Sequence, residues 1–183
     1  METIDQQTLE QLRFPVGPYI VPNIIDQDTL TQWKQTIAEL PNRLWAEVAQ
    51  LTDAQLDTPY RPGGWTVRQV VHHLADSHIN SYTRFKLSLT ENRPTIKPYL
   101  EALWAEMEDG KNLPIEPSMQ ILRGVHLRWS VVLNQMTPAD MAKSFFHPES
   151  QEEVRLDEAI GQYDWHCRHH LAHITQLKKR MNW

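Results

Sequence analysis

The stretch TVRQVVHHLADSHINSYTRFKLSL, residues 66–89, decides the fold class of this chain. Its apolar residues recur at spacings of three and four, which is typical of one face of an amphipathic helix. That face consists of Val67, Val70, Val71, Leu74, His78, Tyr82, Phe85 and Leu89. Thr66 with Gln69 three residues later has the form of a capping box, so the helix is predicted to begin there.

Three other segments show the same helical spacing. One runs from Leu30 to Leu51 and contains Pro41, which predicts a kink. Another runs from Met119 to Met136, and a third is predicted from about residue 156 to residue 181. Four amphipathic helices with almost no β pattern indicate an all-α fold, a four-helix bundle.

The connections between these helices are long. Residues 91–118 contain four prolines and leave room for at most a short helix near residues 100–108, and residues 137–155 contain a His147-Pro148 turn. Connections of this length argue against a minimal up-down bundle with tight turns. Prolines in residues 1–25 predict an extended N-terminal arm, preceded at most by a helical turn, and residues 26–183 are predicted to form a single bundle domain.

The composition argues against nucleic acids and membranes as binding partners. The chain has 183 residues and a formal charge of −5, so it lacks the basic character of a nucleic-acid binder and the polybasic cluster of a membrane-surface protein. No apolar run approaches the roughly 18 residues of a spanning helix, and the first 25 residues lack a signal-peptide pattern. A single cysteine, Cys167, fits a reducing cytoplasm. We therefore expect a cytoplasmic protein that binds neither nucleic acid nor membrane.

Histidines are clustered along the chain. Segment 166–173 reads HCRHHLAH and contains two i, i+4 pairs, His166/His170 and His169/His173. Residues four apart share a helix face, so each pair could hold one metal ion. At about 100° per residue, the pair 166/170 borders the apolar stripe and the pair 169/173 lies on the flank, towards solvent. The pair 166/170 is therefore the better candidate for a metal site inside a bundle.

A pair of histidines on one helix supplies two ligands, whereas catalytic zinc has three protein ligands and an open position. Segment 72–78 offers His72, His73 and His78, and periodicity does not choose between His72 and His73. His78 lies on the apolar stripe and is expected to be a core residue or a hydrogen-bonding neighbour of the site. Asp76, like His169 and His173, is a candidate for orienting a ligating imidazole through the second ring nitrogen.

Several blocks carry a family resemblance. The blocks GGWTVRQVVHHLADSH (63–78), NSYTRFKLSLTE (80–91) and YDWHCRHHLAHI (163–174), with FPVGPY (14–19) and TPYRPGGWTVRQ (58–69), cover most of the chain. Together they resemble the DinB-like superfamily, and more narrowly the YfiT-type metal-dependent hydrolases, also described as bacillithiol S-transferases.

The resemblance implies a four-helix bundle that holds one divalent ion per chain, zinc or nickel. It assigns the metal ligands to His73, His166 and His170, which agrees with the angular choice of 166/170 and selects His73 over His72. It also implies a cytoplasmic homodimer.

Three functions remain open at this point. A three-histidine ion with an open position could activate water for hydrolysis, or hold a low-molecular-weight thiol as thiolate for S-transfer. The third alternative is a non-catalytic bundle that is stapled by its metal or acts as a sensor. The segment HCRHH lacks the glutamate of the H-E-x-x-H peptidases, so peptidase activity is disfavoured. The catalytic residues, the general base, the small-molecule substrate, the metal and the dimer interface are not identified by the sequence.

Overall fold

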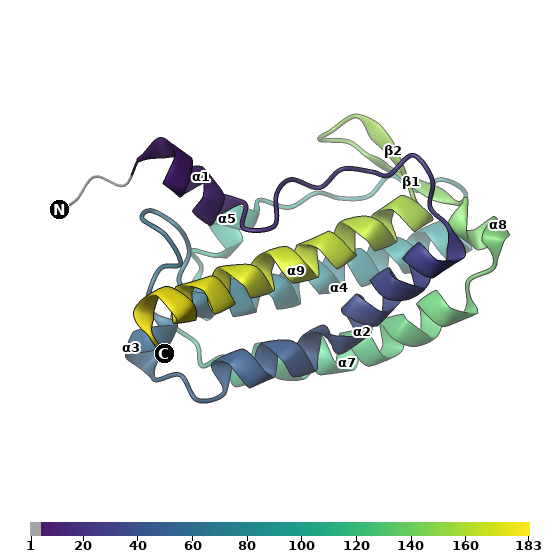
Figure 1. The fold of residues 1–183 in the computed structure, drawn as a ribbon. Coiled ribbons are helices and arrows are strands. Elements are labelled where there is room, and N and C mark those ends of the chain that lie inside the picture. Colours follow the sequence, from purple (N-terminus) through teal and green to yellow (C-terminus); the bar gives the residue numbers. More distant parts are fainter. Residues whose placement is uncertain (1–4) are drawn as a thin grey trace.

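Four long helices build the molecule (Figure 1): α2 Gln27–Val48, α4 Val67–Thr90, α7 Glu116–Gln135 and α9 Leu156–Met181. The computed structural model describes residues 5–183. Between the long helices lie α1 Gln6–Arg13, α3 Asp53–Leu56, α5 Glu101–Trp104, α6 Glu108–Lys111, α8 Pro138–Met141, β1 Ser144–His147 and β2 Glu152–Arg155. The predicted four-helix bundle is confirmed. No helix in this part of the chain is long and apolar enough to cross a membrane.

The long helices form a ring in which α2 and α4 each contact both α7 and α9. Neighbours in the ring are therefore not always neighbours in sequence, because α2 and α4 follow one another in the chain but lie on a diagonal. Helices α4 and α7 run parallel, since His72 contacts Ser118 and His78, further along α4, contacts His126. A parallel pair of neighbours cannot be joined by a tight turn.

This arrangement explains the long connection between α4 and α7. Helix α4 has 24 residues and so spans about 36 Å. Residues 91–115 must return over that whole length before α7 can begin beside the start of α4. They do so as a proline-rich segment that contains the short helices α5 and α6, where we expect at most one helix.

The N-terminal arm lies along α9 (Figure 1). Among the described residues it begins with α1, a helix of eight residues capped by Asp5 where we expect at most one helical turn, and is then extended. The indole N–H of Trp165 donates to the carbonyl of Gly17 at 2.8 Å, and the Tyr19 hydroxyl donates to the carbonyl of Glu158 at 2.9 Å. The arm therefore runs antiparallel to α9 and covers one of its flanks.

A small hairpin precedes α9, and the sequence pattern does not predict it. Strands β1 and β2 pair antiparallel, with Phe145 opposite Val154, and the predicted His147-Pro148 turn lies at the tip. Each strand has only four residues, and in β1 only Phe145 is fully buried. Strands this short do not show the alternation by which a strand is recognised.

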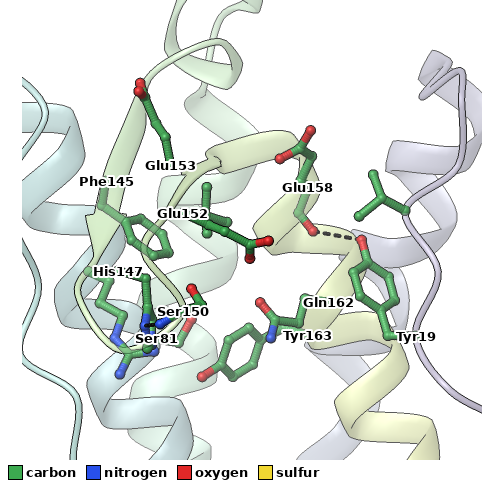
Figure 2. A pocket seen from close by; sticks show the side chains of 13 residues that line it. Tyr19, Ser81, Phe145, His147, Ser150, Glu152, Glu153, Glu158, Gln162 and Tyr163 are labelled. Atoms are coloured by element: carbon green, nitrogen blue, oxygen red, sulfur yellow. Dashed lines mark hydrogen bonds between the residues drawn. The ribbon is translucent and has the colours of Figure 1, made fainter.

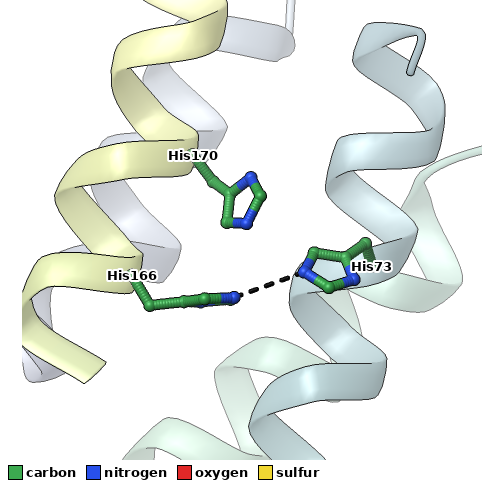
Figure 3. A group of neighbouring side chains, drawn as sticks. All are labelled: His73, His166 and His170. Atoms are coloured by element: carbon green, nitrogen blue, oxygen red, sulfur yellow. Dashed lines mark hydrogen bonds between the residues drawn. The ribbon is translucent and has the colours of Figure 1, made fainter. Parts of the chain in front are cut away.

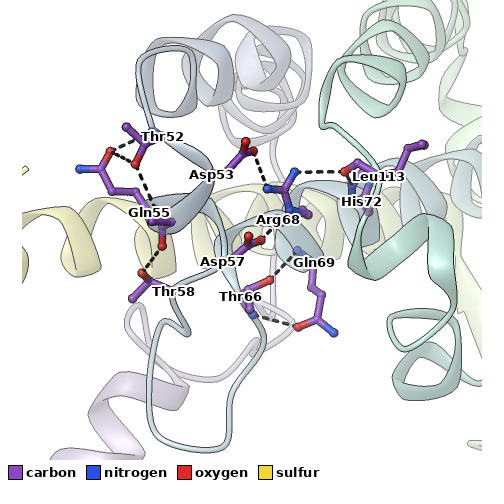
Figure 4. Close-up of polar contacts among 11 residues, drawn as sticks. Thr52, Asp53, Gln55, Asp57, Thr58, Thr66, Arg68, Gln69, His72 and Leu113 are labelled. Atoms are coloured by element: carbon purple, nitrogen blue, oxygen red, sulfur yellow. Dashed lines mark hydrogen bonds and ion pairs between the residues drawn. The ribbon is translucent and has the colours of Figure 1, made fainter.

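The start of α4 is fixed by polar contacts (Figure 4). Thr66 and Gln69 form the predicted capping box. Within the same first turn, the buried Arg68 guanidinium donates to the carboxylates of Asp53 and Asp57 and to the carbonyl of Leu113. These bonds join α3, α4 and the segment before α7. The register of α4, and with it the position of its histidines, is thereby set at the first turn.

Gly161 provides a test of how the arm and α2 meet α9. A Cβ atom at this position would lie 2.7 Å from the Trp33 ring and from the Tyr19 hydroxyl. We expect Gly161→Ala to lower the free energy of unfolding by about 1–3 kcal/mol through overpacking. Gly124→Ala is the matched control, because an added Cβ there has nothing within 4 Å and the change should stabilise α7 by about 0.5–1 kcal/mol. Urea unfolding measures both, and equal effects would contradict this packing.

Candidate metal centre

Helices α4 and α9 run antiparallel and bring three histidines together. His73 lies on α4, and His166 and His170 lie one turn apart on α9. The Nε2 atoms of His73 and His166 are 3.2 Å apart, and one ligand atom from each of the three rings lies within 4.8 Å of the others. Figure 3 shows that the rings turn a nitrogen towards the space they share. The structure thus brings together the three residues assigned by the resemblance.

Burial keeps these imidazoles neutral. It lowers the pKa of His73 from 6.5 to about 4, with a further contribution from His169. It also lowers the pKa values of His166 and His170 well below 6.5, and the neighbouring histidines add to the effect. A histidine must be deprotonated to bind a metal ion, so this cluster is already in its binding form at neutral pH.

The donor set fits a divalent first-row ion. Three neutral nitrogen donors suit zinc, nickel, copper or iron better than they suit magnesium or calcium, which prefer oxygen ligands. The Nδ1 atom of His170 is buried and has no hydrogen-bond partner among the described residues. Its ring is therefore held by packing, with Trp65 stacked at 6.4 Å and His73 edge-on at 4.8 Å between centroids.

His72, the alternative that periodicity left open, points to another part of the bundle. Its Nδ1 lies 2.7 Å from the Ser118 hydroxyl and its Nε2 lies 3.0 Å from the carbonyl of Leu113. Both ring nitrogens therefore have partners in and before α7. His72 anchors the α4–α7 contact, and His73 alone of the two faces α9.

The flank of α9 that carries His169 and His173 differs from its prediction. We expect this pair towards solvent, but the side chains are only 6% and 3% exposed because the arm and the loop before α4 cover them. The Nε2 of His173 lies 3.1 Å from the carbonyl of Arg13, and its ring stacks on Tyr60. With His170, the pair forms a second group of histidines close enough to share an ion.

The carboxylate of Asp76 does not orient any imidazole by a hydrogen bond between described residues. Its backbone carbonyl accepts a hydrogen bond from the side-chain amide of Asn80, and the carboxylate has no such bond among the described residues. Burial, with a smaller contribution from Asp109, raises the pKa of its carboxyl from 3.8 to about 6. The proposed role of Asp76 in orienting a ligand therefore has no support from these contacts.

A cavity adjoins the cluster. Its larger part, about 560 Å³, lies between α4, the hairpin and the start of α9 (Figure 2). A smaller part, about 120 Å³, is lined by His166 and shares Arg84, His147, Gln162 and Tyr163 with the larger one. A small molecule in this space would reach one of the three histidines.

Two further histidines extend from the cluster: His78, which the sequence predicts as a core residue or a hydrogen-bonding neighbour of the site, and His126, which sequence reasoning did not assign to it. The Nε2 of His78 lies 3.1 Å from the Nδ1 of His166, and the Nδ1 of His78 lies 2.7 Å from the Nε2 of His126. Both are completely or almost completely buried. Both lie on apolar stripes of their helices. A histidine at a core position was the sequence signal that could have indicated a buried hydrogen-bonding role.

Comparisons with known proteins agree with this geometry. The family model described as DinB superfamily matches residues 36–174. A protein of Bacillus mycoides (strain KBAB4) is 52% identical over 96% of this chain and 100% of its own. YfiT of Bacillus subtilis (strain 168) is 48% identical over 96% of this chain and 99% of its own. The names of both describe them provisionally as metal-dependent hydrolases.

A solved structure of Bacillus subtilis YfiT superposes with a TM-score of 0.92, at 48% identity, over 94% of this chain and 99% of that one. It is described as a "probable metal-dependent hydrolase with an unusual four-helix bundle topology". The ring order found here, with consecutive helices on a diagonal, is likewise not that of a simple up-down bundle. With the family model matching well over half of its residues, the chain belongs to the DinB superfamily.

Proposed function

We propose that this protein is a metal-dependent hydrolase of a small molecule, in which His73, His166 and His170 hold one divalent ion per chain, zinc or nickel. The observation that carries the proposal is the convergence of three neutral imidazoles beside a cavity that reaches His166. A divalent ion in such a site supplies Lewis acidity, which acidifies water or a thiol and polarises a carbonyl group.

The residues around the cluster define the rest of the proposed site. Trp65 covers His73 with its ring 4.6 Å away, which keeps bulk water from that side. The residues that line the cavity include Arg84, Glu152 and Glu158. This wall could hold a polar substrate with groups of both charges. The cavity also favours an open site over a closed metal staple, which would need a fourth protein ligand.

Thiol S-transfer is the second candidate. The observation that favours it is that, among the described residues, the hydrogen bonds of the three clustered histidines run to other histidines and to no carboxylate. A thiol that loses its proton on binding needs no further base, because the thiolate is itself the nucleophile.

The two reactions are separated by omitting one reactant. We expect the metal-loaded protein to hydrolyse members of an ester and amide panel with no thiol present. The metal-free protein and the His166→Ala variant are the controls and should show no turnover. Joint consumption of a thiol and an alkylating electrophile, without hydrolysis, would overturn the proposal in favour of S-transfer. No turnover in either assay would leave a metal-stapled bundle or sensor.

A further inference from the structure

A line of three imidazoles crosses the bundle core from the candidate metal centre. It begins at His166 of α9, passes to His78 of α4 and then to His126 of α7, and ends at the carbonyl of Ile37 of α2. The three distances are 3.1, 2.7 and 2.5 Å. Each of the four bundle helices therefore contributes one residue to a single hydrogen-bonded line.

The carbonyl at the end of the line fixes the position of every proton. A carbonyl oxygen only accepts, so the Nδ1 of His126 must carry the hydrogen that bonds to Ile37. The Nε2 of a neutral His126 is then an acceptor and takes a hydrogen bond from Nδ1–H of His78. By the same rule, the Nε2 of His78 accepts from Nδ1–H of His166.

His166 is thus left with a lone pair on Nε2, which faces His73 within the cluster. The reverse order of protons would place a lone pair of His126 against the lone pairs of the Ile37 carbonyl. An additional proton on His78 or His126 would set two N–H groups against each other in a core where His78 is 0% and His126 is 1% exposed. The neutral order that begins at Ile37 therefore satisfies every bond in the line.

Aromatic side chains hold the line in place. Trp129 lies edge-on to His78 and to His126, each at 6.0 Å between centroids, and Tyr163 lies edge-on to His78 at 5.1 Å. Trp129 and Phe85 are themselves completely buried and packed edge to face. The imidazoles cannot flip without displacing this packing, so the tautomers and the ring orientations are fixed together.

We propose that His78 and His126 are positioning residues, which set the tautomer and orientation of His166 so that its Nε2 lone pair faces the metal centre. The identity of the ion rests on the proposed function, but the proton order does not. A ligating histidine commonly donates its other ring N–H to a carbonyl or carboxylate, and loss of such a partner costs about 10–100-fold in metal affinity. Here the carbonyl is that of Ile37, and it is connected to His166 through the imidazoles of His78 and His126.

Imidazole ¹⁵N–¹H correlation spectra of the metal-free protein test the proton order directly. We expect His166, His78 and His126 all in the Nδ1–H tautomer at neutral pH. An Nε2–H tautomer for His166 in the wild-type protein would overturn the proposal, whether or not the protein binds metal or hydrolyses any substrate. If the tautomers are as expected and no ion binds, the proposed function fails and the proton order stands.

Substitution of His126 tests the positioning role. In His126→Phe the line is cut, so we expect a mixture of His166 tautomers and a 10–100-fold loss of affinity for Zn²⁺ measured by competition with a chelator. His126→Gln keeps one acceptor and one donor, the oxygen and nitrogen of the same amide group, and should restore most of the affinity. Leu122→Ala, a fully buried change one turn away on α7, should lower stability without altering tautomer or affinity.

The outcomes separate a positioning role from a structural one. Wild-type affinity and an unmixed Nδ1–H tautomer in His126→Phe would overturn the positioning role. Equal losses of affinity in His126→Phe and Leu122→Ala would do so too, because they would show a general effect of core destabilisation. Should His126→Phe fail to fold, the spectra of the wild type and of His126→Gln still decide the matter.

Discussion

Replacement of His73, His166 or His170 by alanine is expected to abolish stoichiometric binding of a divalent ion. Each substitution leaves two imidazoles, one fewer than the three protein ligands of a catalytic zinc site. The loss of affinity should exceed the 10–100-fold that follows removal of a ligand's hydrogen-bond partner. Metal analysis of dialysed protein and calorimetric titration with Zn²⁺ and Ni²⁺ measure the effect.

His169→Ala is the matched control on the same helix. His169 is as buried as His170, but its ring stacks on Trp165, 4.4 Å away between centroids. We expect this variant to retain one ion per chain. Retention of one ion by His73→Ala, together with its loss in His169→Ala, would move the site to the second histidine group on α9.

Acidification is expected to unfold the metal-free protein at a pH where ordinary carboxylates are still ionised. Burial lowers the pKa from 6.5 to about 4 for His73, His126 and His169, and to about 3 for His173. The unfolded chain therefore binds more protons than the folded chain between about pH 6.5 and pH 4. The stability that these groups provide is fully present above pH 6.5 and is lost as the pH falls through that window.

The magnitude is large because several histidines act in the same direction. One such group changes the free energy of unfolding by about 1.4 kcal/mol per pH unit within its window, and four together by about 5.5 kcal/mol per pH unit. Domains are stable by only about 5–15 kcal/mol, so unfolding is expected near pH 5. Urea titrations from pH 7.5 to pH 5 with a chelator present measure the slope. A free energy of unfolding that does not change with pH contradicts the prediction. His126→Gln should lower the number of protons taken up on unfolding by about one.

Much of the fold follows from local signals. The capping box at Thr66 and the stripe after it place the start of α4 at the correct residue. Helix α9 spans residues 156–181 as its periodicity predicts. These elements are long and strongly amphipathic, so one helix face is enough to identify them. The hairpin at residues 144–155 lacks such a signal because its strands have only four residues each and Phe145 is the one strand residue that is fully buried.

Sequence spacing predicts those parts of the candidate site that lie on a single helix, but not the contacts between helices. Spacing on α9 separated His166/His170 from His169/His173, and the structure places the first pair in the cluster with His73. The burial of His173 depends on the arm, which is distant in sequence. The contact of His78 with His126 depends on the parallel packing of α4 and α7, which periodicity does not encode.

Family resemblance supplied what periodicity left open. His72 and His73 flank the same stripe, and nothing in one helix says which neighbour each will face. The structure gives the physical reason for the choice, since His72 is occupied by Ser118 and Leu113 on the α7 side. A ring order in which α4 lies between α7 and α9 turns adjacent residues towards different partners.

The line from His166 to Ile37 has a consequence for how the bundle opens. Because it takes one residue from each long helix, no single helix can swing away without leaving a buried imidazole or carbonyl unpaired. An unpaired buried polar group costs about 1–3 kcal/mol. The four helices are thereby coupled into one cooperative unit, and sub-global excursions of individual helices are suppressed in favour of all-or-none fluctuations.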